Sequence, residues 1–468
     1  MSEYIPTIGL EIHAELKTKT KMFCNSRNDP EEKRPNVNIC PVCMAHPGTL
    51  PVINREAVKH VIKVGLALGG TIADFTEFDR KNYFYPDIPK GYQISQYKYP
   101  LVSGGSLNSV QITRVHLEED TARSTHDRGD YTLIDFNRAG IPLMELVTEP
   151  VIRSAEEASS FARELQLLLR YLGAGDANME KGEMRVEANI SVSKTDEYGT
   201  KVEVKNLNSF KVVEKAIAYE IERQIETLES GGKVSQETRG WDDAKQETFP
   251  QREKESSHDY RYFPDPDLPK LKISEISEFA PEVLRKELPE LSWEKRARFL
   301  EKYGLKEEST ELFVQNNELG NFFENVVAGK EPDFVKLASN YITSDLMALL
   351  KGNAEWKLPV EESFSRLITM VKNGKLSSRG AKDVLDILYK EGGDPEEIAK
   401  ERGLMQESDE GKLKEIVEKI IDANSGAVKE YKNGKEASLQ FLIGQGMKEA
   451  KGSANPSMLK ELFLKHLR

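Results

Sequence analysis

Ionisable side chains alternate with apolar ones along several short segments of this chain. In the segment 9–16, Glu11, His13 and Glu15 are separated by apolar residues, and would share one face of a β-strand. The alternation recurs in three further segments. Segment 185–192 has Arg185, Glu187 and Asn189 on its polar face, and segment 201–205 has Glu203 and Lys205. The segment ending at Glu149 has Glu145 on its polar face. Carboxylates, imidazole and amide oxygens are ligands suited to Mg²⁺ and polyphosphate. The pattern therefore predicts a metal-assisted nucleotide site.

The same alternation has a purely structural explanation. An antiparallel sheet with one solvated face would produce it without any activity. Solvated faces, however, favour Thr and Lys with replaceable partners, whereas these segments concentrate carboxylates. The sequence also contains neither of the common glycine-rich phosphate loops, since Gly173-Ala174-Gly175 is followed by Asn178 where a third Gly belongs. Nucleotide chemistry in this chain would have to use carboxylate-bound metals.

Three cysteines, Cys24, Cys40 and Cys43, lie in one short stretch of the chain. Their odd number and clustering do not make a disulfide framework. A metal site is the alternative that this spacing favours.

Composition limits the class of protein. A length of 468 residues suggests about three folding units. No apolar run approaches the roughly 20 residues of a membrane span, and the N-terminus lacks a basic region followed by an apolar stretch, so we expect a cytoplasmic protein. A net charge of -12 argues against a protein that coats DNA or RNA non-specifically, but it leaves a shaped RNA contact open.

The elements that would position these residues change in type along the chain. Up to residue 293, strand-like segments alternate with helices. One of these helices begins at a capping box formed by Ser154 and Glu157. Residues 294–405 read as short amphipathic helices, for example 332–350 and 378–389. Residues 406–468 open with an acidic linker and continue as helices, and from Ala437 onward five Lys or Arg stand against two Glu. We therefore predict an α+β domain, a helical domain and a helical tail.

Several longer motifs resemble those of the B subunits of the tRNA-dependent amidotransferases over essentially the whole chain. An aromatic and charged run such as 79–87 has little reason to exist as core, because its charges would be costly to bury without partners. The resemblance is carried by residues 9–13, 78–87, 92–96, 116–120, 135–138, 205–210, 236–239 and 259–264.

The resemblance implies a fold and a reaction. Residues 1–293 would form an antiparallel-sheet cradle similar to glutamine synthetase, 294–405 an all-α helical domain, and 406–468 a helical tail that binds tRNA. The implied enzyme is a ligase that forms carbon–nitrogen bonds with glutamine as amido donor. It would use ATP and Mg²⁺ to phosphorylate the side-chain carboxylate of Glu on tRNA(Gln) or Asp on tRNA(Asn). Ammonia from an amidase partner, the A subunit, would then displace the phosphate, in a heterotrimer that a small C subunit completes.

Site residues follow from the same resemblance, and the implied magnesium ligands are Glu11, His13, Glu119 and Glu145. Strand alternation disagrees in part, because it groups Glu118 with His116 and Asp120 and turns Glu119 to the apolar face. A bulge or a strand end would restore Glu119, so Glu118 stays as its rival.

Further roles are implied for residues around these ligands. Lys81 and Tyr83 would lie at the ammonia entrance or the transamidation centre, where a Lys–carboxylate gate would pass ammonia; a structural ion pair is the alternative for Lys81. The predicted catalytic residues are Lys81, Tyr83, Glu119 and Glu145, and the predicted nucleotide-binding residues are Arg185, Glu187, Asn189, Lys205 and Asn206. Glu187 stands where the family usually has Asp, which lengthens its reach to a metal.

Many members of the resembled family bind zinc through Cys-x-Cys and Cys-x-x-Cys. This chain keeps Cys24, Cys40 and Cys43 but has Ser26 at the remaining position. Structural zinc normally takes four protein ligands, and His46 would complete the set. Two rival functions stay open at this point, a catalytically silent tRNA-binding scaffold and a glutamine synthetase-like ligase that acts on a small molecule.

Overall fold

The computed structural model describes residues 4–126, 129–252, 260–352, 356–406, 410–450 and 454–467. The chain divides into two compact units, Met1–Ser292 and Trp293–Arg468. Half of the predicted acidic linker 406–411, at 407–409, and Asp259 of the last motif lie outside the described residues.

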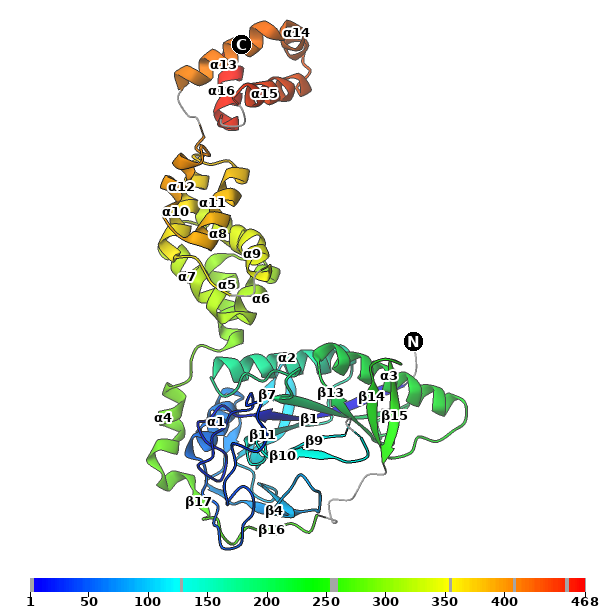
Figure 1. The fold of residues 1–468 in the computed structure, drawn as a ribbon. Coiled ribbons are helices and arrows are strands. Elements are labelled where there is room, and N and C mark those ends of the chain that lie inside the picture. Colours follow the sequence, from blue (N-terminus) through cyan, green and yellow to red (C-terminus); the bar gives the residue numbers. More distant parts are fainter. Residues whose placement is uncertain are drawn as a thin grey trace. The chain divides into compact units, whose positions relative to one another are not determined.

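The first unit is built on one large, mainly antiparallel sheet (Figure 1). Its central strand β1 (Ile5–Glu15) lies between β11 (Pro142–Thr148) and β12 (Met184–Ser193), which both run antiparallel to it. Beyond β11 follow β8 (Val110–Glu119), β5 (Tyr92–Ser95), β4 (Asp79–Asn82) and β16 (Phe263–Pro264); beyond β12 follow β13 (Val202–Leu207), β14 (Thr238–Asp242) and β15 (Glu247–Arg252). Among the described strands only β13 and β14 pair in parallel. The predicted α+β class is confirmed.

Shorter elements complete this unit. They are the strands β2 (Thr71–Ile72), β3 (Phe75–Thr76), β6 (Val102–Ser103), β7 (Ser106–Leu107), β9 (Arg123–Thr125), β10 (Leu133–Asp135) and β17 (Leu271–Lys272), the helices α1 (Arg55–Ala67) and α4 (Pro281–Lys286), and two single 3₁₀ turns, η1 (Ile273–Glu275) and η2 (Ser277–Phe279).

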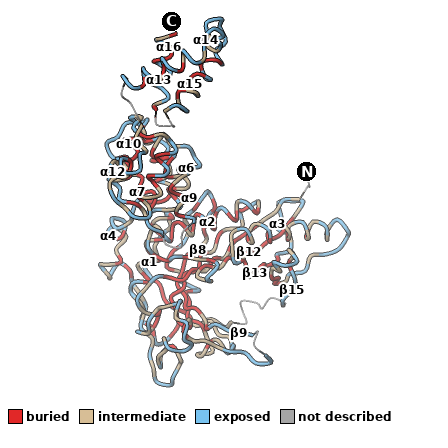
Figure 2. Tube along the Cα trace, turned by 45° about the horizontal axis from the view of Figure 1, so that its top comes forward, coloured by how far each residue is buried: buried red, intermediate tan, exposed pale blue. Residues whose placement is uncertain are grey.

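Helices α2 (Ala155–Tyr171) and α3 (Phe210–Glu229) cover one face of the sheet (Figure 1). The apolar residues of β1 supply this covered face, and Ile12 and Ala14 are both 0% exposed. Figure 2 shows the sheet strands β8, β12 and β13 as largely buried. Ser154 caps α2 by accepting from the backbone N–H of Glu157 at 3.1 Å, as the capping box predicts. Since one face is filled by helices, the polar residues of the same strands are directed to the other.

A buried ion-pair network fastens α3 to the sheet. Glu220 is 0% exposed and accepts from Arg223 at 2.7 Å and from the Thr248 hydroxyl at 2.9 Å. Arg239, from the 236–239 motif, lies 3.5 Å from Glu220 and donates to Thr248 at 2.8 Å. Arg239 therefore has a structural role, whereas its neighbour Thr238 turns to the open face.

Replacing Glu220 by Ala should lower the free energy of unfolding by about 2–3 kcal/mol, because the half-buried Arg223 and the buried Arg239 would lose a shared carboxylate, although Arg239 keeps its ion pair with Glu237. Urea unfolding of the first unit measures this loss. Glu222→Ala, on the exposed side of the same helix, is the matched control and should change stability by less than about 0.5 kcal/mol. Equal losses in the two variants would contradict the structural role of the network.

The second unit is helical in its described part. It contains α5 (Ser292–Tyr303), α6 (Glu307–Gln315), α7 (Asn317–Val327), α8 (Pro332–Asn340), the π-helical turn η3 (Tyr341–Leu346), α9 (Met347–Lys351), α10 (Glu361–Lys372), α11 (Ser378–Glu391), α12 (Pro395–Glu401), α13 (Glu410–Ala423), α14 (Ser425–Lys432), α15 (Ala437–Glu449) and α16 (Pro456–Leu467). The predicted helix 332–350 is thus interrupted by a π-helical turn, and the predicted helix 378–389 corresponds to α11.

Two separate hydrophobic cores stabilise these helices. One contains Phe313 and Phe323, whose rings stack at 4.5 Å, and the other contains Leu442 and Phe463. Searched over the described residues, the helices include none that is both long and apolar enough to cross a membrane.

Candidate metal and nucleotide site

The register of the sheet brings the predicted polar residues together on the face opposite α2 and α3. His13 pairs with Glu145 across β1 and β11, and Glu145 pairs with His116 across β11 and β8. Glu11 pairs with Glu187 across β1 and β12. Residues that are far apart in the sequence therefore form one polar surface.

Four of these side chains, Glu11, His13, Glu118 and Glu145, form what we call the carboxylate cluster. His13 Nε2 lies 3.3 Å from Glu145 Oε2. It lies 3.9 Å from Glu11 Oε1 and 3.9 Å from Glu118 Oε2. Candidate metal-ligand atoms form three overlapping groups, each within 4.8 Å: Glu11, His13 and Glu145; His116, Glu118 and Glu145; and Glu11, Glu187 and Glu203.

The donor set of the carboxylate cluster fits a divalent cation. Burial and the nearby charge of Glu145 raise the pKa of Glu11, and a bound cation would offset this repulsion between the carboxylates. The Oδ1 atom of Asn189, on the adjacent strand β12, is buried and has no hydrogen-bond partner among the described residues. A site rich in oxygen ligands, with several negatively charged carboxylates, is the environment that Mg²⁺ prefers.

The expected place of Glu119 in this cluster is corrected by the structure. Regular pairing with β11 continues to the end of β8, where Glu118 faces Leu143 and Glu119 faces Pro142, so no bulge turns Glu119 around. Glu119 instead forms an ion pair with Lys90 and accepts from the backbone N–H of Ile94 at 2.9 Å. Glu118, the rival residue, is held by Ser95 at 2.7 Å and by Gln93 at 3.0 Å.

Cationic side chains lie beside the carboxylate cluster, and with Glu11, Glu118 and Glu145 they line a cavity of ≈ 180 Å³. Arg114 Nη2 lies 3.1 Å from Glu145 Oε1. Lys81 lines the same cavity, and although burial opposes its charge, Glu118 and Glu145 raise its pKa. Lys81 is therefore a fixed positive charge directed at the centre of the site.

Tyr83 and Asn206 lie less centrally than predicted. The Tyr83 ring contacts those of Tyr85 and Tyr260, and burial raises the pKa of its hydroxyl. Tyr83 is not among the residues that line the cavity. Asn206 is exposed and has a positive φ of 63°, which places it at an irregular point of β13.

The remaining predicted nucleotide-binding residues pair with partners of opposite charge. Lys205 Nζ lies 2.7 Å from Glu187 Oε2. Arg185 Nη2 lies 3.0 Å from Asp120 Oδ1, and Arg138 holds the other oxygen of Asp120 at 2.7 Å. Although burial opposes it, the two guanidinium groups lower the pKa of Asp120.

The three cysteines form a second group with metal-ligand spacing. Cys43 Sγ lies 3.9 Å from Cys40 Sγ and 3.8 Å from both Ser26 Oγ and Lys21 Nζ. A hydrogen bond from Cys24 and the charge of Lys21 outweigh burial and lower the pKa of Cys43 to about 4. His46, the expected fourth ligand, is not part of this group.

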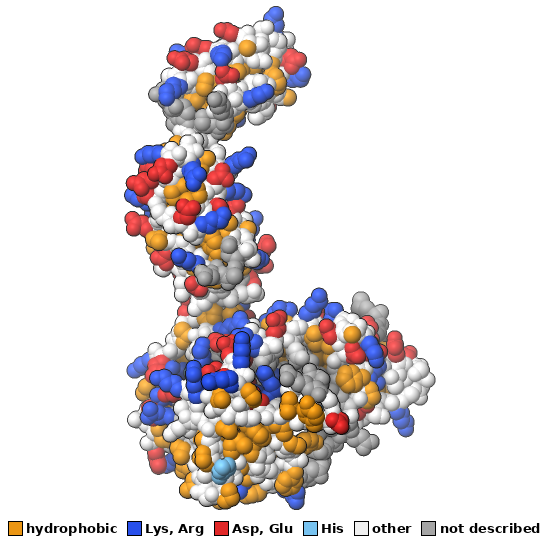
Figure 3. All heavy atoms as spheres, viewed as in Figure 1, with side chains coloured by type: hydrophobic (Ala, Val, Ile, Leu, Met, Phe, Trp, Pro, Cys, Tyr) orange, Lys and Arg blue, Asp and Glu red, His pale blue; other side chains and the backbone are white. Residues whose placement is uncertain are grey.

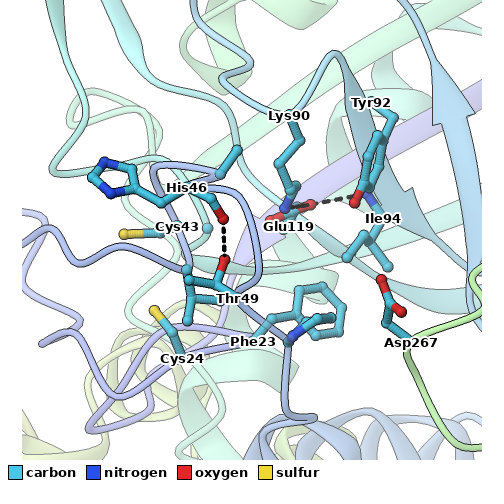
Figure 4. A pocket seen from close by; sticks show the side chains of 14 residues that line it. Phe23, Cys24, Cys43, His46, Thr49, Lys90, Tyr92, Ile94, Glu119 and Asp267 are labelled. Carbon is cyan, nitrogen blue, oxygen red and sulfur yellow. Dashed lines mark hydrogen bonds and ion pairs between the residues drawn. The ribbon is translucent and has the colours of Figure 1, made fainter.

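A second cavity is lined by Cys24 and Cys43 together with Glu119. Figure 4 shows the Lys90–Glu119 pair on one side of this cavity and Cys24 and Cys43 on the other. Because Glu118 and Glu119 point to opposite faces of β8, this cavity and the carboxylate cluster lie on different sides of the same strand.

Comparison with known proteins shows the family of the chain. Residues 6–277 match the GatB/GatE catalytic domain, and residues 321–467 match the domain described as the GatB domain. The chain belongs to the GatB/GatE family. Three relatives are each named as the B subunit of an aspartyl/glutamyl-tRNA(Asn/Gln) amidotransferase. They are the proteins of Carboxydothermus hydrogenoformans (44% identical, 99% of this chain and 98% of the relative), Crocosphaera subtropica (42%, 100% and 98%) and Thermoanaerobacter pseudethanolicus (43%, 99% and 99%). The sequence-based recognition of the family is confirmed.

Several residues of this GatB/GatE chain that contact the site, among them Arg114, were not predicted as site residues. Lys90 and Arg138 stand in loops without any periodic pattern, and only their ion pairs reveal them. Asp120 was predicted to share the polar face of a strand with His116 and Glu118, but no sequence signal linked it to Arg185.

The pKa of His13 would make metal binding at the carboxylate cluster pH-dependent. Burial alone would lower the pKa, but Glu145, Glu11 and Glu118 outweigh it and raise it to about 9. A protonated imidazole cannot be a ligand, so the cation must displace this proton. We expect Mn²⁺ affinity, measured by electron paramagnetic resonance, to rise up to about tenfold per pH unit from pH 7 to 9 and then level off. His13→Asn should flatten this dependence, and an unchanged slope in that variant would contradict the assignment.

Proposed function

We propose that this chain is the B subunit of a glutamine-dependent tRNA amidotransferase, a ligase that phosphorylates and then amidates an amino acid attached to tRNA. The substrate is the side-chain carboxylate of Glu on tRNA(Gln) or Asp on tRNA(Asn). An amidase partner, the A subunit, would supply ammonia from glutamine, and a small C subunit would complete a cytoplasmic heterotrimer. The observation that carries this proposal is the carboxylate cluster on the open face of the sheet, in a chain that lacks a phosphate loop.

Each side chain of the cluster has a role in this reaction. Glu11, His13, Glu118 and Glu145 would hold Mg²⁺, which when bound neutralises the phosphate oxygens of ATP. Lys81 and Arg114 would supply positive charge where the transferred phosphoryl group develops negative charge. Asn189 offers an unused oxygen, while Arg185 and Lys205 are oriented by Asp120 and Glu187. Phosphorylation is required because a carboxylate is a poor electrophile, and phosphate is a good leaving group for ammonia to displace.

The other side of β8 suits ammonia delivery. The resemblance implies a Lys–carboxylate gate, and the pair that meets this description is Lys90 with Glu119 rather than Lys81, which faces the carboxylate cluster. The adjoining cysteines would hold zinc through Cys24, Cys40 and Cys43, with a fourth position open to Ser26 or water. Elemental analysis of purified protein tests the zinc site, and a stoichiometry near zero would remove it.

The decisive experiment is reconstitution with the amidase partner and the small third subunit. The complex should consume ATP only when Glu-tRNA(Gln) or Asp-tRNA(Asn) is present, and should form Gln-tRNA or Asn-tRNA from glutamine. A silent scaffold would bind tRNA without ATP consumption, and a small-molecule ligase would consume ATP with free glutamate. Assay of each misacylated tRNA also shows which one is used.

We also propose three domains, with a catalytic cradle at 1–293, a helical domain at 294–405 and a tRNA-binding tail at 406–468. Deleting residues 406–468 should weaken tRNA binding about tenfold or more, because phosphate contacts of basic residues dominate such affinities. Gel-shift titration measures the change, and circular dichroism checks that the cradle stays folded. Unaltered tRNA affinity would count against the tail's role.

A further inference from the structure

Aromatic rings form a continuous run beside the carboxylate cluster. The rings of Tyr97 and Tyr262 are stacked, with centroids 3.9 Å apart and planes 7° apart. Tyr260 meets Tyr262 edge-on at 6.0 Å, and Tyr83 meets Tyr260 in the same way at 6.0 Å. Lys81 Nζ lies 5.1 Å from the centroid of the Tyr260 ring.

The stacked pair is held in place by the surrounding backbone. Tyr97 lies two residues after the end of β5, and its N–H donates to Asp79 Oδ2 at 3.0 Å. Tyr262 directly precedes β16, which pairs with β4 through Phe263 and Arg80. Both rings are thus anchored to the same edge of the sheet, which keeps their stacking geometry fixed.

The outer face of Tyr97 is open towards solvent and the cavity. Tyr97 is 49% exposed although Tyr262 covers one side of its ring, whereas packing aromatics of this chain such as Phe313 are 0% exposed. Tyr97, Tyr260 and Tyr262 line the same cavity as Glu11, Lys81 and Glu118. On the molecular face drawn in Figure 3, hydrophobic side chains gather over the lower part of the first unit, the region that holds β4 and β16 in Figure 1.

We propose that Tyr97, backed by Tyr262, stacks against the adenine base of a substrate bound in this cavity. This inference rests on the proposed function, in which both ATP and the charged tRNA carry adenine, the tRNA at its single-stranded 3′ end. A base next to the carboxylate cluster suits either substrate, because the reacting phosphate and the reacting carboxylate each lie a short chain of atoms away from an adenosine. Unpaired bases are commonly bound by stacking on aromatic side chains, which adds affinity without a hydrogen-bond pattern.

The test uses the complete complex with three variants. Tyr97→Leu removes the aromatic face, Tyr97→Phe keeps it, and Tyr99→Leu alters an exposed aromatic ring that does not line the cavity. One arm measures binding of a non-hydrolysable ATP analogue by calorimetry without RNA. The other measures binding of the uncharged tRNA, and of the same uncharged tRNA lacking its terminal adenosine.

We expect Tyr97→Leu to weaken one of these ligands about 10- to 100-fold, and Tyr97→Phe and Tyr99→Leu to bind like the wild type. Weaker ATP-analogue binding identifies the nucleotide as the stacked ligand. If Tyr97→Leu weakens binding of the complete tRNA but binds the truncated tRNA like the wild type, the terminal adenosine is the stacked ligand.

Wild-type affinity for both ligands in Tyr97→Leu would overturn the stacking inference, as would a Tyr97→Phe variant as weak as Tyr97→Leu. Thermal unfolding of each variant shows whether the ring is needed for folding instead. Failure of this inference is distinguishable from failure of the proposed function, because in the latter case the wild-type complex itself would not amidate tRNA.

Discussion

Replacing Glu118 by Gln should reduce ATP-dependent phosphorylation of misacylated tRNA about 100- to 1,000-fold. The substitution keeps the shape, and its amide oxygen can accept from Gln93 while its amide NH2 donates to the Ser95 hydroxyl, but it removes a charge 3.9 Å from His13 that the proposed metal would require. Loss of one preorganised electrostatic contact in an active site commonly costs this much. The measurement is ADP formation in the reconstituted complex at saturating ATP and tRNA.

Glu119→Gln is the matched control, since it makes the same change one residue further along β8. Its side chain belongs to the cavity on the other side of the strand, so we expect phosphorylation within about threefold of wild type. If Glu119→Gln lost phosphorylation and Glu118→Gln kept it, the position of Glu119 in the structure would not represent the active state.

Strand alternation predicted the position of Glu118 on the same face as His116, which is where the structure has it. The period of two in β8 groups His116 with Glu118, and this period is maintained because β11 pairs with every residue from Arg114 to Glu119. The same rule predicted that Glu11 and His13 share a face. What alternation could not supply is which strands are neighbours, so the approach of Glu145 to both His13 and His116 needed the sheet order.

Features that depend on loops could not be predicted in this way. The stacking of Tyr97 on Tyr262 joins two segments that are distant in the sequence and carry no shared period. The three cysteines were recognised by type, but the sequence did not show that Lys21 and Ser26 would contact Cys43 and that His46 would not join the group. Tertiary contacts decide such cases because loop residues are not constrained by a repeating geometry.

Lys81→Met and Lys90→Met should affect different halves of the reaction. Lys81 faces Glu118 and Glu145 in the cavity of the carboxylate cluster, so its loss should reduce phosphorylation about 100-fold. Lys90 pairs with Glu119 in the cavity on the other side of β8, so Lys90→Met should leave ADP formation nearly unchanged. It should lower glutamine-dependent amidation about tenfold, because an unpaired Glu119 would alter the ammonia path.

The ratio of ADP formed to tRNA amidated separates these two outcomes. In Lys81→Met both quantities should fall together, since no acyl phosphate forms for ammonia to attack. In Lys90→Met the ratio should rise, because the acyl phosphate would form and then be lost to water. Free ammonium chloride supplied in place of glutamine should leave the Lys81→Met defect unchanged. A rise of the ratio in Lys81→Met, with a normal ratio in Lys90→Met, would reverse the two assignments and make Lys81 the ammonia gate.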